Sequence, residues 1–345
     1  MMKNMEKNKI DLKEILAGSG NILGPECDVA ISSRVRLARN LADYPFPARL
    51  DREGRRKIAE NFKTAAGDRD YDFINFADLS GLEIEALAEK RIISPEFAGN
   101  NTERELITDI KNGVYVMLGE EDHLRIQCIK PGFAVNEAFE QADDFDNAAD
   151  LNYAYSEELG YLTQCPTNLG TGLRASVMMH LPALTMSRQI ERIVAQLPKL
   201  GLTIRGFYGE GSEVGGDLYQ ISSNITLGVS EDQTLEKINS VAKEIMELER
   251  SARAELYKNS RETLTDKIKR AYGILKHAYM ISSMEFLKHY SAVRLGFGYG
   301  IIKNPDYKIL DNLLVNVMPA NLTINKNAQP ENRDIIRAEY IQEVL

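Results

Sequence analysis

The chain has 345 residues, of which 43% are hydrophobic and 27% charged, a composition typical of a globular protein large enough for two domains. Its formal net charge of −9 argues against a general nucleic-acid binder, although clustered arginines can still form a local basic pocket. We therefore expect no nucleic-acid partner, and we expect any bound anion to be small.

Cysteine and histidine usage excludes several classes of site. Cys27, Cys128 and Cys165 form no CxxC pair, and the four histidines show no metal-ligand spacing, so neither a disulfide framework nor a zinc site is expected. The N-terminal residues carry charges where a signal peptide needs an apolar core. The most apolar stretch, Ala175 to Met186, is too short to cross a bilayer. A cytoplasmic protein without membrane contact is expected.

In chain order, the first informative segment is a predicted strand in which Arg34 and Arg36 alternate with Val35 and Leu37. Because side chains of a strand alternate between two faces, both arginines would project from the same face. Taken alone, the segment favours an ordinary solvated strand face.

The next elements resemble scaffold. Apolar residues with helical spacing predict a helix over 51–66 and a shorter helix over 81–91, and a strand is predicted over 114–118.

An acidic turn follows. Glu120, Glu121 and Asp122 lie between two β-prone runs, and the polar face of the second run carries His123 and Arg125. Taken alone, such a turn favours a solvent-exposed hairpin tip. A helix is predicted from Phe133 onward.

The segment Tyr161 to Pro182 reads YLTQCPTNLGTGLRASVMMHLP. Cys165 and Arg174 stand on opposite sides of a turn that contains two glycines. Free cysteine behaves as a small hydrophobe, so the segment alone favours a structural cysteine beside a surface arginine.

Periodicity predicts the remaining elements of this half: an amphipathic helix over 187–197, a strand with Arg205 over 202–208, a strand over 217–222 and a long helix over 236–257. Residues 209–216 contain four glycines and Glu210, which is typical of a loop that can close over a ligand. They are not a Walker loop, because no Lys-Ser/Thr follows at the required spacing.

From residue 260 the pattern changes to short helical runs, so we expect a mixed domain over 1–259 and a mainly α-helical domain over 260–345. The last run places Arg333 and Arg337 four residues apart on one helix face, with Asp334 beside them. On composition alone, this trio favours a helix-stabilising ion pair.

Considered together, the arginines indicate a shared polyanion. They stand on predicted strands or beside turns in four separate segments of an acidic protein: Arg34, Arg36, Arg125, Arg174 and Arg205. The planar guanidinium binds two phosphate oxygens at once and keeps its charge. With Glu121, Glu210 and Cys165, the site would hold anions together with a cation, which fits phosphoryl transfer onto a positively charged acceptor.

Three fragments in this order resemble the ATP:guanidino phosphotransferases, which include creatine and arginine kinases: SSRVR from Ser32, EEDHLR from Glu120, and CPTNLGT from Cys165 followed by RASV. The resemblance extends from Ser32 to about Ser260. Because the first of these fragments begins only about thirty residues into the sequence, we expect no counterpart of the helical N-terminal domain that precedes this region in the small-metabolite kinases. Residues 206–213 and 333–338 are instead similar to the bacterial protein arginine kinases of this family.

The resemblance implies a fold and a set of roles. The fold would be α+β, an antiparallel sheet flanked by helices and followed by a small helical domain that mediates homodimerisation. ATP would be bound by Arg34, Arg36, Arg125, Arg174, Arg205, His123 and Ser32, and Mg²⁺ would be held through ATP without protein ligands. Glu121 and Glu210 would grip the acceptor guanidinium, and Cys165 would act beside it as a thiolate. Gly119 departs from the family, which usually has Asn there.

The resemblance further implies a phosphoarginine pocket formed by Arg333, Asp334 and Arg337. The acceptor would be an exposed arginine of another protein, and the partners would include an activator protein (McsA), the heat-shock repressor and the ClpC/ClpP protease. Two alternatives stay open: a kinase of free arginine or another small guanidino compound, and a non-catalytic adaptor that binds phosphoarginine.

Overall fold

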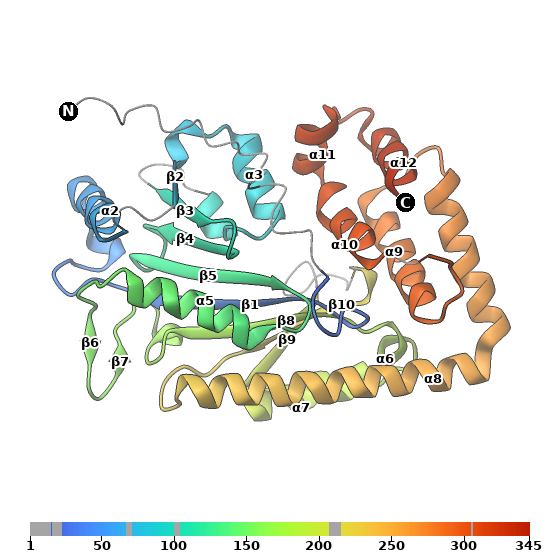
Figure 1. Cartoon of the computed structure of the whole chain (residues 1–345), viewed down its shortest axis with the longest axis horizontal. Coiled ribbons are helices and arrows are strands. Elements are labelled where there is room, and N and C mark those ends of the chain that lie inside the picture. Colours follow the sequence, from blue (N-terminus) through green and yellow to red (C-terminus); the bar gives the residue numbers. More distant parts are fainter. Residues whose placement is uncertain (1–14, 16–22, 67–70, 100–103, 207–214, 305) are drawn as a thin grey trace.

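The computed structural model describes residue 15 and residues 23–66, 71–99, 104–206, 215–304 and 306–345. Within them, an antiparallel sheet of eight strands forms the centre, in the order β2-β3-β4-β5-β1-β8-β10-β9 (Figure 1). Its strands are β1 (Ala30–Arg39), β2 (Asp72–Asn75), β3 (Glu105–Asp109), β4 (Val114–Leu118), β5 (Leu124–Pro131), β8 (Leu173–His180), β9 (Leu202–Gly206) and β10 (Leu218–Ser223). A separate two-stranded hairpin pairs β6 (Tyr155–Ser156) with β7 (Gly160–Tyr161). The predicted antiparallel sheet is confirmed.

Helices flank this sheet. Those before residue 231 are α2 (Arg52–Ala66), α3 (Gly81–Glu89), α4 (Pro95–Ala98), α5 (Val135–Ala148), α6 (Pro182–Met186) and α7 (Ile190–Gln196). Short 3-10 turns are η1 (Pro47–Arg49), η2 (Phe76–Asp78), η3 (Pro166–Asn168), η4 (Leu197–Leu200) and η5 (Gly215–Asp217). The predicted helix over 187–197 is shorter than expected, because Arg188 takes a left-handed backbone conformation (φ 56°) and α7 begins only after it.

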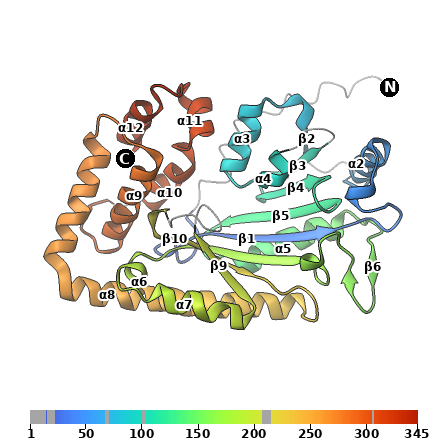
Figure 2. The same cartoon turned by 180° about the vertical axis from the view of Figure 1, so that it is seen from behind.

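One face of the sheet is packed against α5 and the first half of α8 (Glu231–His277), which lie together on the same side in Figure 2. Val35 and Leu37 of β1 and Leu124 and Ile126 of β5 are fully buried in this core. The alternation predicted for β1 is therefore confirmed. Burying these side chains orients the other members of each strand, the arginines included, toward the opposite face.

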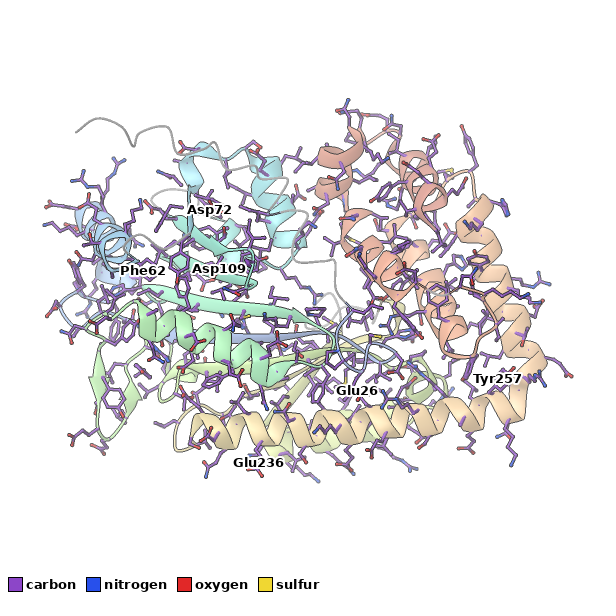
Figure 3. All side chains as sticks on the ribbon, in the orientation of Figure 1. Glu26, Phe62, Asp72, Asp109, Glu236 and Tyr257 are labelled. Atoms are coloured by element: carbon purple, nitrogen blue, oxygen red, sulfur yellow. The ribbon has the colours of Figure 1, made fainter. Side chains whose placement is uncertain are left out.

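Helix α8 runs beneath the sheet and then turns upward near Tyr257, which is labelled in Figure 3. A capping box of Ser230 and Gln233 starts it, and only Ser260 departs from helical geometry within it (φ −142°, ψ 35°). We predicted a helix that ends near Tyr257, and helical geometry is indeed interrupted close to that point, at Ser260, before a second helical stretch continues to His277. None of the helices in the described ranges has the length and apolarity needed to span a membrane.

The C-terminal part is helical, as predicted. It contains α9 (Ser283–Gly298), α10 (Tyr307–Asn316), α11 (Pro319–Lys326) and α12 (Arg333–Val344), and the first, second and last of these share a core with the second half of α8. Phe286, Leu310 and Ile341 are fully buried in that core. Helix α11 was not predicted, since it has only eight residues and no side-chain cap.

A buried ion pair ties β1 to α5. Arg39 and Asp146 are 1% and 4% exposed, and Arg39 Nε donates to the Asp146 carboxylate at 2.7 Å. Tyr153 donates its hydroxyl to the second oxygen of Asp146, and the Arg39 guanidinium lies 3.6 Å from the ring centre of Tyr161. Each charge is thus compensated inside the core.

Replacing Asp146 by Ala should therefore destabilise the protein by about 3–5 kcal/mol, because the Arg39 charge would stay buried without its partner. Urea unfolding measures the loss. The matched control is Asp266→Ala, which breaks an exposed pair with Arg270 and should cost less than about 1 kcal/mol. Equal losses in the two variants would contradict this view of the core.

Candidate active site

The strand register places the five predicted arginines on one face of the sheet. Arg36 pairs with Arg174 across β1 and β8, and Arg125 pairs with Ala38 across β1 and β5. Arg205 of β9 pairs with Gln220 of β10, and Gln220 pairs with Met178 of β8. Met178 is four residues from Arg174 on the same strand, so Arg205 shares the face of Arg174. Arg34 precedes Arg36 by two residues and shares its face.

These arginines line a single cavity of about 900 Å³. Its other charged lining residues are Glu89, Arg91, Glu96, Arg104, Glu120 and Glu121. The five arginines that the sequence singled out are thus brought together. Guanidinium groups outnumber carboxylates in this cavity, so its interior is positive.

Burial and mutual repulsion make the arginine charges costly. Burial, with Arg91 and Arg125 nearby, lowers the pKa of Arg34 to about 9, and burial lowers the pKa of Arg36 and of Arg174 as well. The Nε atoms of Arg36 and Arg174 are buried and have no hydrogen-bond partner among the described residues. Buried donors of this kind need an acceptor. The cavity therefore fits a multiply charged anion with several oxygens.

The three acids of the turn have different surroundings. Glu120 is buried and accepts hydrogen bonds from Ser94 and Arg125. Asp122 is also buried and accepts from Asn40 at 2.7 Å and from the backbone of Gln164 at 2.8 Å. Glu121 is exposed to the cavity. Glu121 is thus the acid of this turn that can meet an incoming group.

Gly119 starts this turn with φ 80°, and its N–H donates to the His123 carbonyl at 3.0 Å. The left-handed conformation favours Gly and is also tolerated by Asn. The departure from the family's Asn at this position is thus compatible with the same turn.

Cys165 lies at the edge of the arginine cluster. Its sulfur is 3.1 Å from the Thr167 hydroxyl. Burial lowers the pKa of Arg174, and the nearby Cys165 and Glu121 offset part of that lowering. The turn that follows is closed by hydrogen bonds between Tyr161 and Gly170. Gly170 has φ 108°, and a Cβ there would lie 2.1 Å from a backbone oxygen, so only glycine fits. Cys165 is therefore within electrostatic range of Arg174 but is not among the residues that line the cavity.

Comparisons with known proteins agree with this geometry. The sequence model described as ATP:guanido phosphotransferase, C-terminal catalytic domain, matches residues 54–252, and the one described as protein-arginine kinase McsB C-terminal domain matches residues 261–345. A protein-arginine kinase of Caldanaerobacter subterraneus subsp. tengcongensis is 45% identical over 329 residues, which cover 92% of this chain and 97% of that protein. One of Bacillus subtilis is 44% identical over 332 residues, 93% of this chain and 91% of that protein. The chain belongs to the protein-arginine kinases of the ATP:guanido phosphotransferase family. The predicted resemblance is confirmed.

Solved structures of this family share the fold. The duplicated taurocyamine kinase of Schistosoma mansoni with bound transition-state-analogue components matches with a TM-score of 0.60 and 26% identity, over 66% of this chain and 34% of that chain. A lombricine kinase matches with a TM-score of 0.60 and 24% identity, over 68% of this chain and 71% of that chain. The catalytic fold of the guanidino kinases is thereby shown.

A second cavity, of about 260 Å³, adjoins the first in this protein-arginine kinase. The two share Arg34, Glu89, Arg91 and Gln220, and the second also contains Ser32. Its further lining combines polar and charged side chains with seven apolar ones: Leu23, Ile31, Ile129, Pro131, Met178, Leu314 and Val315. Ser32 therefore lines this adjoining cavity and not the larger one that contains all five predicted arginines.

His123 lies outside both cavities. Its ring is buried, with Nδ1 accepting from the Leu41 N–H at 3.0 Å and Nε2 lying 2.9 Å from the Pro45 carbonyl. Burial lowers its pKa, so the neutral ring is favoured. In this conformation His123 holds the loop after β1 and offers no free nitrogen to a phosphate.

Two residues of the cavities were not recognised from the sequence. Arg91 lines both cavities and follows α3, where it had been assigned to scaffold. Gln220 accepts from Arg34 Nη2 at 3.3 Å. Its position opposite Arg205 gives it the same face, so strand alternation could have identified it had the register been known.

The predicted phosphoarginine-binding residues Arg333, Asp334 and Arg337 line neither cavity. Glu210 falls outside the described residues. Arg337 is buried in the C-terminal core, where it donates to the carbonyls of Val317 at 2.9 Å and Ile281 at 2.8 Å and pairs with Asp334. Arg333 has a buried Nε without a hydrogen-bond partner in the described parts of the chain.

Among the described residues, no group of three or more His, Cys, Asp or Glu side chains is placed to hold a metal ion. The buried, unpartnered arginine nitrogens of the large cavity instead fit phosphate oxygens.

Lys90, which lines the second cavity, generates a pH prediction. Burial lowers its pKa from 10.5 to about 8. Between about pH 8 and 10.5 the unfolded chain then binds more protons than the folded one, so the free energy of unfolding should rise with pH. Lys90→Met should remove that rise and stabilise the protein below pH 8. Urea unfolding across this range measures it, with exposed Lys199→Met as a control that should keep the wild-type slope; an unchanged slope in Lys90→Met would contradict the prediction.

Proposed function

We propose that this chain is an ATP-dependent protein-arginine kinase, which transfers the γ-phosphate of ATP to arginine side chains of proteins. The observation that carries the proposal is the cavity in which five arginines from four strands meet the exposed Glu121. A triphosphate satisfies the guanidinium groups, and the Glu121 carboxylate, with Cys165 near Arg174, attracts a positively charged acceptor.

The reaction follows from these groups. An acceptor guanidinium is protonated and therefore a poor nucleophile. Glu121, together with Glu210, orients one nitrogen in line with the γ-phosphate and takes its proton. The N–P bond forms as the bond from the γ-phosphorus to the bridging oxygen breaks, and ADP leaves with that electron pair. Cys165 stabilises the guanidinium electrostatically, without a covalent intermediate.

The arginines Arg34, Arg36, Arg125, Arg174 and Arg205 stabilise the charge that spreads over the transferring group. Mg²⁺, held through ATP oxygens and water, would neutralise part of the phosphate charge. The nucleoside then extends into the smaller cavity, because that cavity continues from Arg34, does not include Glu121, and offers apolar side chains beside polar ones. Ser32 meets the nucleotide there.

The two alternatives are less well supported. A kinase of free arginine and a non-catalytic adaptor are not favoured by relatives of 44–45% identity that are named protein-arginine kinases over more than nine tenths of this chain. The adaptor is further disfavoured by the intact group of arginines, Glu121 and Cys165.

The C-terminal domain, residues 260–345, is proposed to serve dimerisation and phosphoarginine binding. Tyr279, Met280 and Met284 are 77%, 56% and 49% exposed and lie together around the start of α9, an apolar surface that suits a second copy of the chain. Arg333 offers an unpartnered nitrogen beside Asp334. By family membership, the cytoplasmic partners would be the activator McsA, the heat-shock repressor and the ClpC/ClpP protease, in stress-related protein quality control.

Incubation with radiolabelled Mg-ATP should place acid-labile phosphate on the arginines of casein. Glu121→Gln should lower the rate by at least about 100-fold, because the proton acceptor is lost, while ATP affinity changes less than about twofold. Glu157→Gln, on the exposed β6–β7 hairpin, is the control and should keep full activity.

The outcomes separate the three functions. Label on free arginine alone would support the small-guanidino kinase, and no transfer with retained phosphoarginine binding would support the adaptor. Full activity of Glu121→Gln would overturn the role given to that residue.

Arg333→Met should weaken phosphoarginine binding by about tenfold or more, because a charged hydrogen bond to the phosphoryl group is removed. Isothermal titration with phosphoarginine measures it, and ATP affinity should not change. This variant is preferable to Arg337→Ala, which also removes two bonds to buried carbonyls. Arg270→Met, at an exposed arginine of α8, is the control; the hypothesis of the pocket is lost if both variants bind like the wild type.

A further inference from the structure

The smaller cavity has a wall that comes from the C-terminal helices. Opposite β1 and β8, it is lined by Lys308, Asp311, Asn312, Leu314 and Val315 of α10. These residues lie outside the segment that matches the guanidino kinase catalytic domain and inside the one that matches the C-terminal domain. A cavity adjoining the phosphate-binding arginines is therefore completed by the second domain.

Helix α10 is held firmly against the sheet. Arg294 of α9 pairs with Asp311 at 2.9 Å and also donates to the carbonyls of Asp28 at 2.9 Å and Cys27 at 2.6 Å, just before β1. Tyr290 donates its hydroxyl to Asp311 at 2.7 Å. Arg294 is 1% exposed, so this link lies in the interior. The wall therefore has a fixed position relative to Ser32 and Arg34.

A second link joins the helices to the same cavity. The Glu89 carboxylate accepts from the backbone N–H groups of Ala320 and Asn321, each at 2.9 Å, at the start of α11. Glu89 also lines both cavities. The middle of α10, through Asp311 and Arg294, and the start of α11 are thus tied to Cys27 and Glu89, which line the smaller cavity.

Lys308 and Asn312 are four residues apart on α10 and border the cavity from the same face of the helix. Neither lines the arginine cavity. An ammonium group and a carboxamide offer donors and an acceptor to the hydroxyls of a ribose or the heteroatoms of a base. Apolar Leu314 and Val315 beside them suit the faces of a base.

We propose that α10 forms one wall of the nucleoside site and that Lys308 and Asn312 contact the bound nucleotide. This inference rests on the proposed kinase function, since it takes ATP as the ligand. At about 260 Å³ the cavity accommodates a nucleoside and not a folded peptide. The C-terminal domain is then part of the ATP site and does more than join two copies of the chain.

The test compares Mg-ATP, AMP and inorganic triphosphate by isothermal titration, on the full chain with Lys308→Met, Asn312→Ala and the double variant. Each single change should weaken ATP and AMP by about three- to tenfold, as expected for one lost hydrogen bond, and leave triphosphate within about twofold. KM for ATP should rise in parallel while kcat stays within about twofold. Lys308→Arg should restore most of the affinity.

Ile309→Ala is the matched control, because Ile309 is an exposed residue of α10 that lines neither cavity. Its affinity for all three ligands should equal that of the wild type. The replaced positions carry exposed or half-buried side chains, and a thermal melt shows whether each variant is folded.

Two results would overturn the inference. Variants that bind ATP and AMP like the wild type would show that α10 does not touch the nucleotide, and an equal loss of triphosphate affinity would show a general effect on the arginine cavity. If the wild type itself bound no ATP and transferred no phosphate, the proposed function would fall with it. If the wild type is active and the variants bind ATP and AMP with unchanged affinity, only the role of α10 is refuted and the proposed function stands.

Discussion

The cost of gathering positive charge on one face of a sheet governs this structure. Burial and neighbouring guanidinium groups lower the pKa of Arg34, Arg36 and Arg174, so the folded chain holds these charges against electrostatic repulsion. The opposite face compensates by packing Val35, Leu37 and their neighbours against α5 and α8. Glu120 pairs directly with Arg125. A bound polyphosphate would offset the repulsion among the other guanidinium groups. The site would therefore favour a highly charged anion over a weakly charged one.

Strand periodicity made this face predictable. Alternation of Arg34 and Arg36 with Val35 and Leu37 is a property of a single strand, and it could be derived before any contact was known. That the five arginines meet in one cavity depends on the register of β1, β5, β8 and β9, and the pairings of β1 with β5 and β8 join residues more than 80 apart in the chain. Gln220 was missed for that reason, whereas Arg91 was missed because it follows a helix that was assigned to scaffold. The occurrence of the five arginines in four segments of an acidic protein already indicated a shared polyanion, and the family resemblance then implied that this anion is ATP.

The local sequence could not predict which of several neighbouring acidic residues are buried and which is exposed. Glu120, Glu121 and Asp122 are consecutive acids, yet Asn40 and the Gln164 backbone engage Asp122 and Ser94 engages Glu120. Those partners lie in other segments, so burial of two acids and exposure of the third follow from tertiary contacts. The same applies to His123, whose ring is occupied by the loop after β1, and to Arg337, which reads as a surface residue in a helical pattern but binds buried carbonyls.

The helical domain links the proposed sites physically. Helices α10 and α12 share a core in which Leu310 and Ile341 are fully buried, and close-packed cores transmit displacement because they contain little free volume. Arg337 adds a polar link, since it joins α12 to the Val317 carbonyl between α10 and α11. A phosphoarginine held beside Arg333 and a nucleotide held against α10 would then act on the same packed unit. Linkage makes any such coupling reciprocal: a nucleotide that shifts α10 changes phosphoarginine affinity by the same factor as phosphoarginine changes nucleotide affinity.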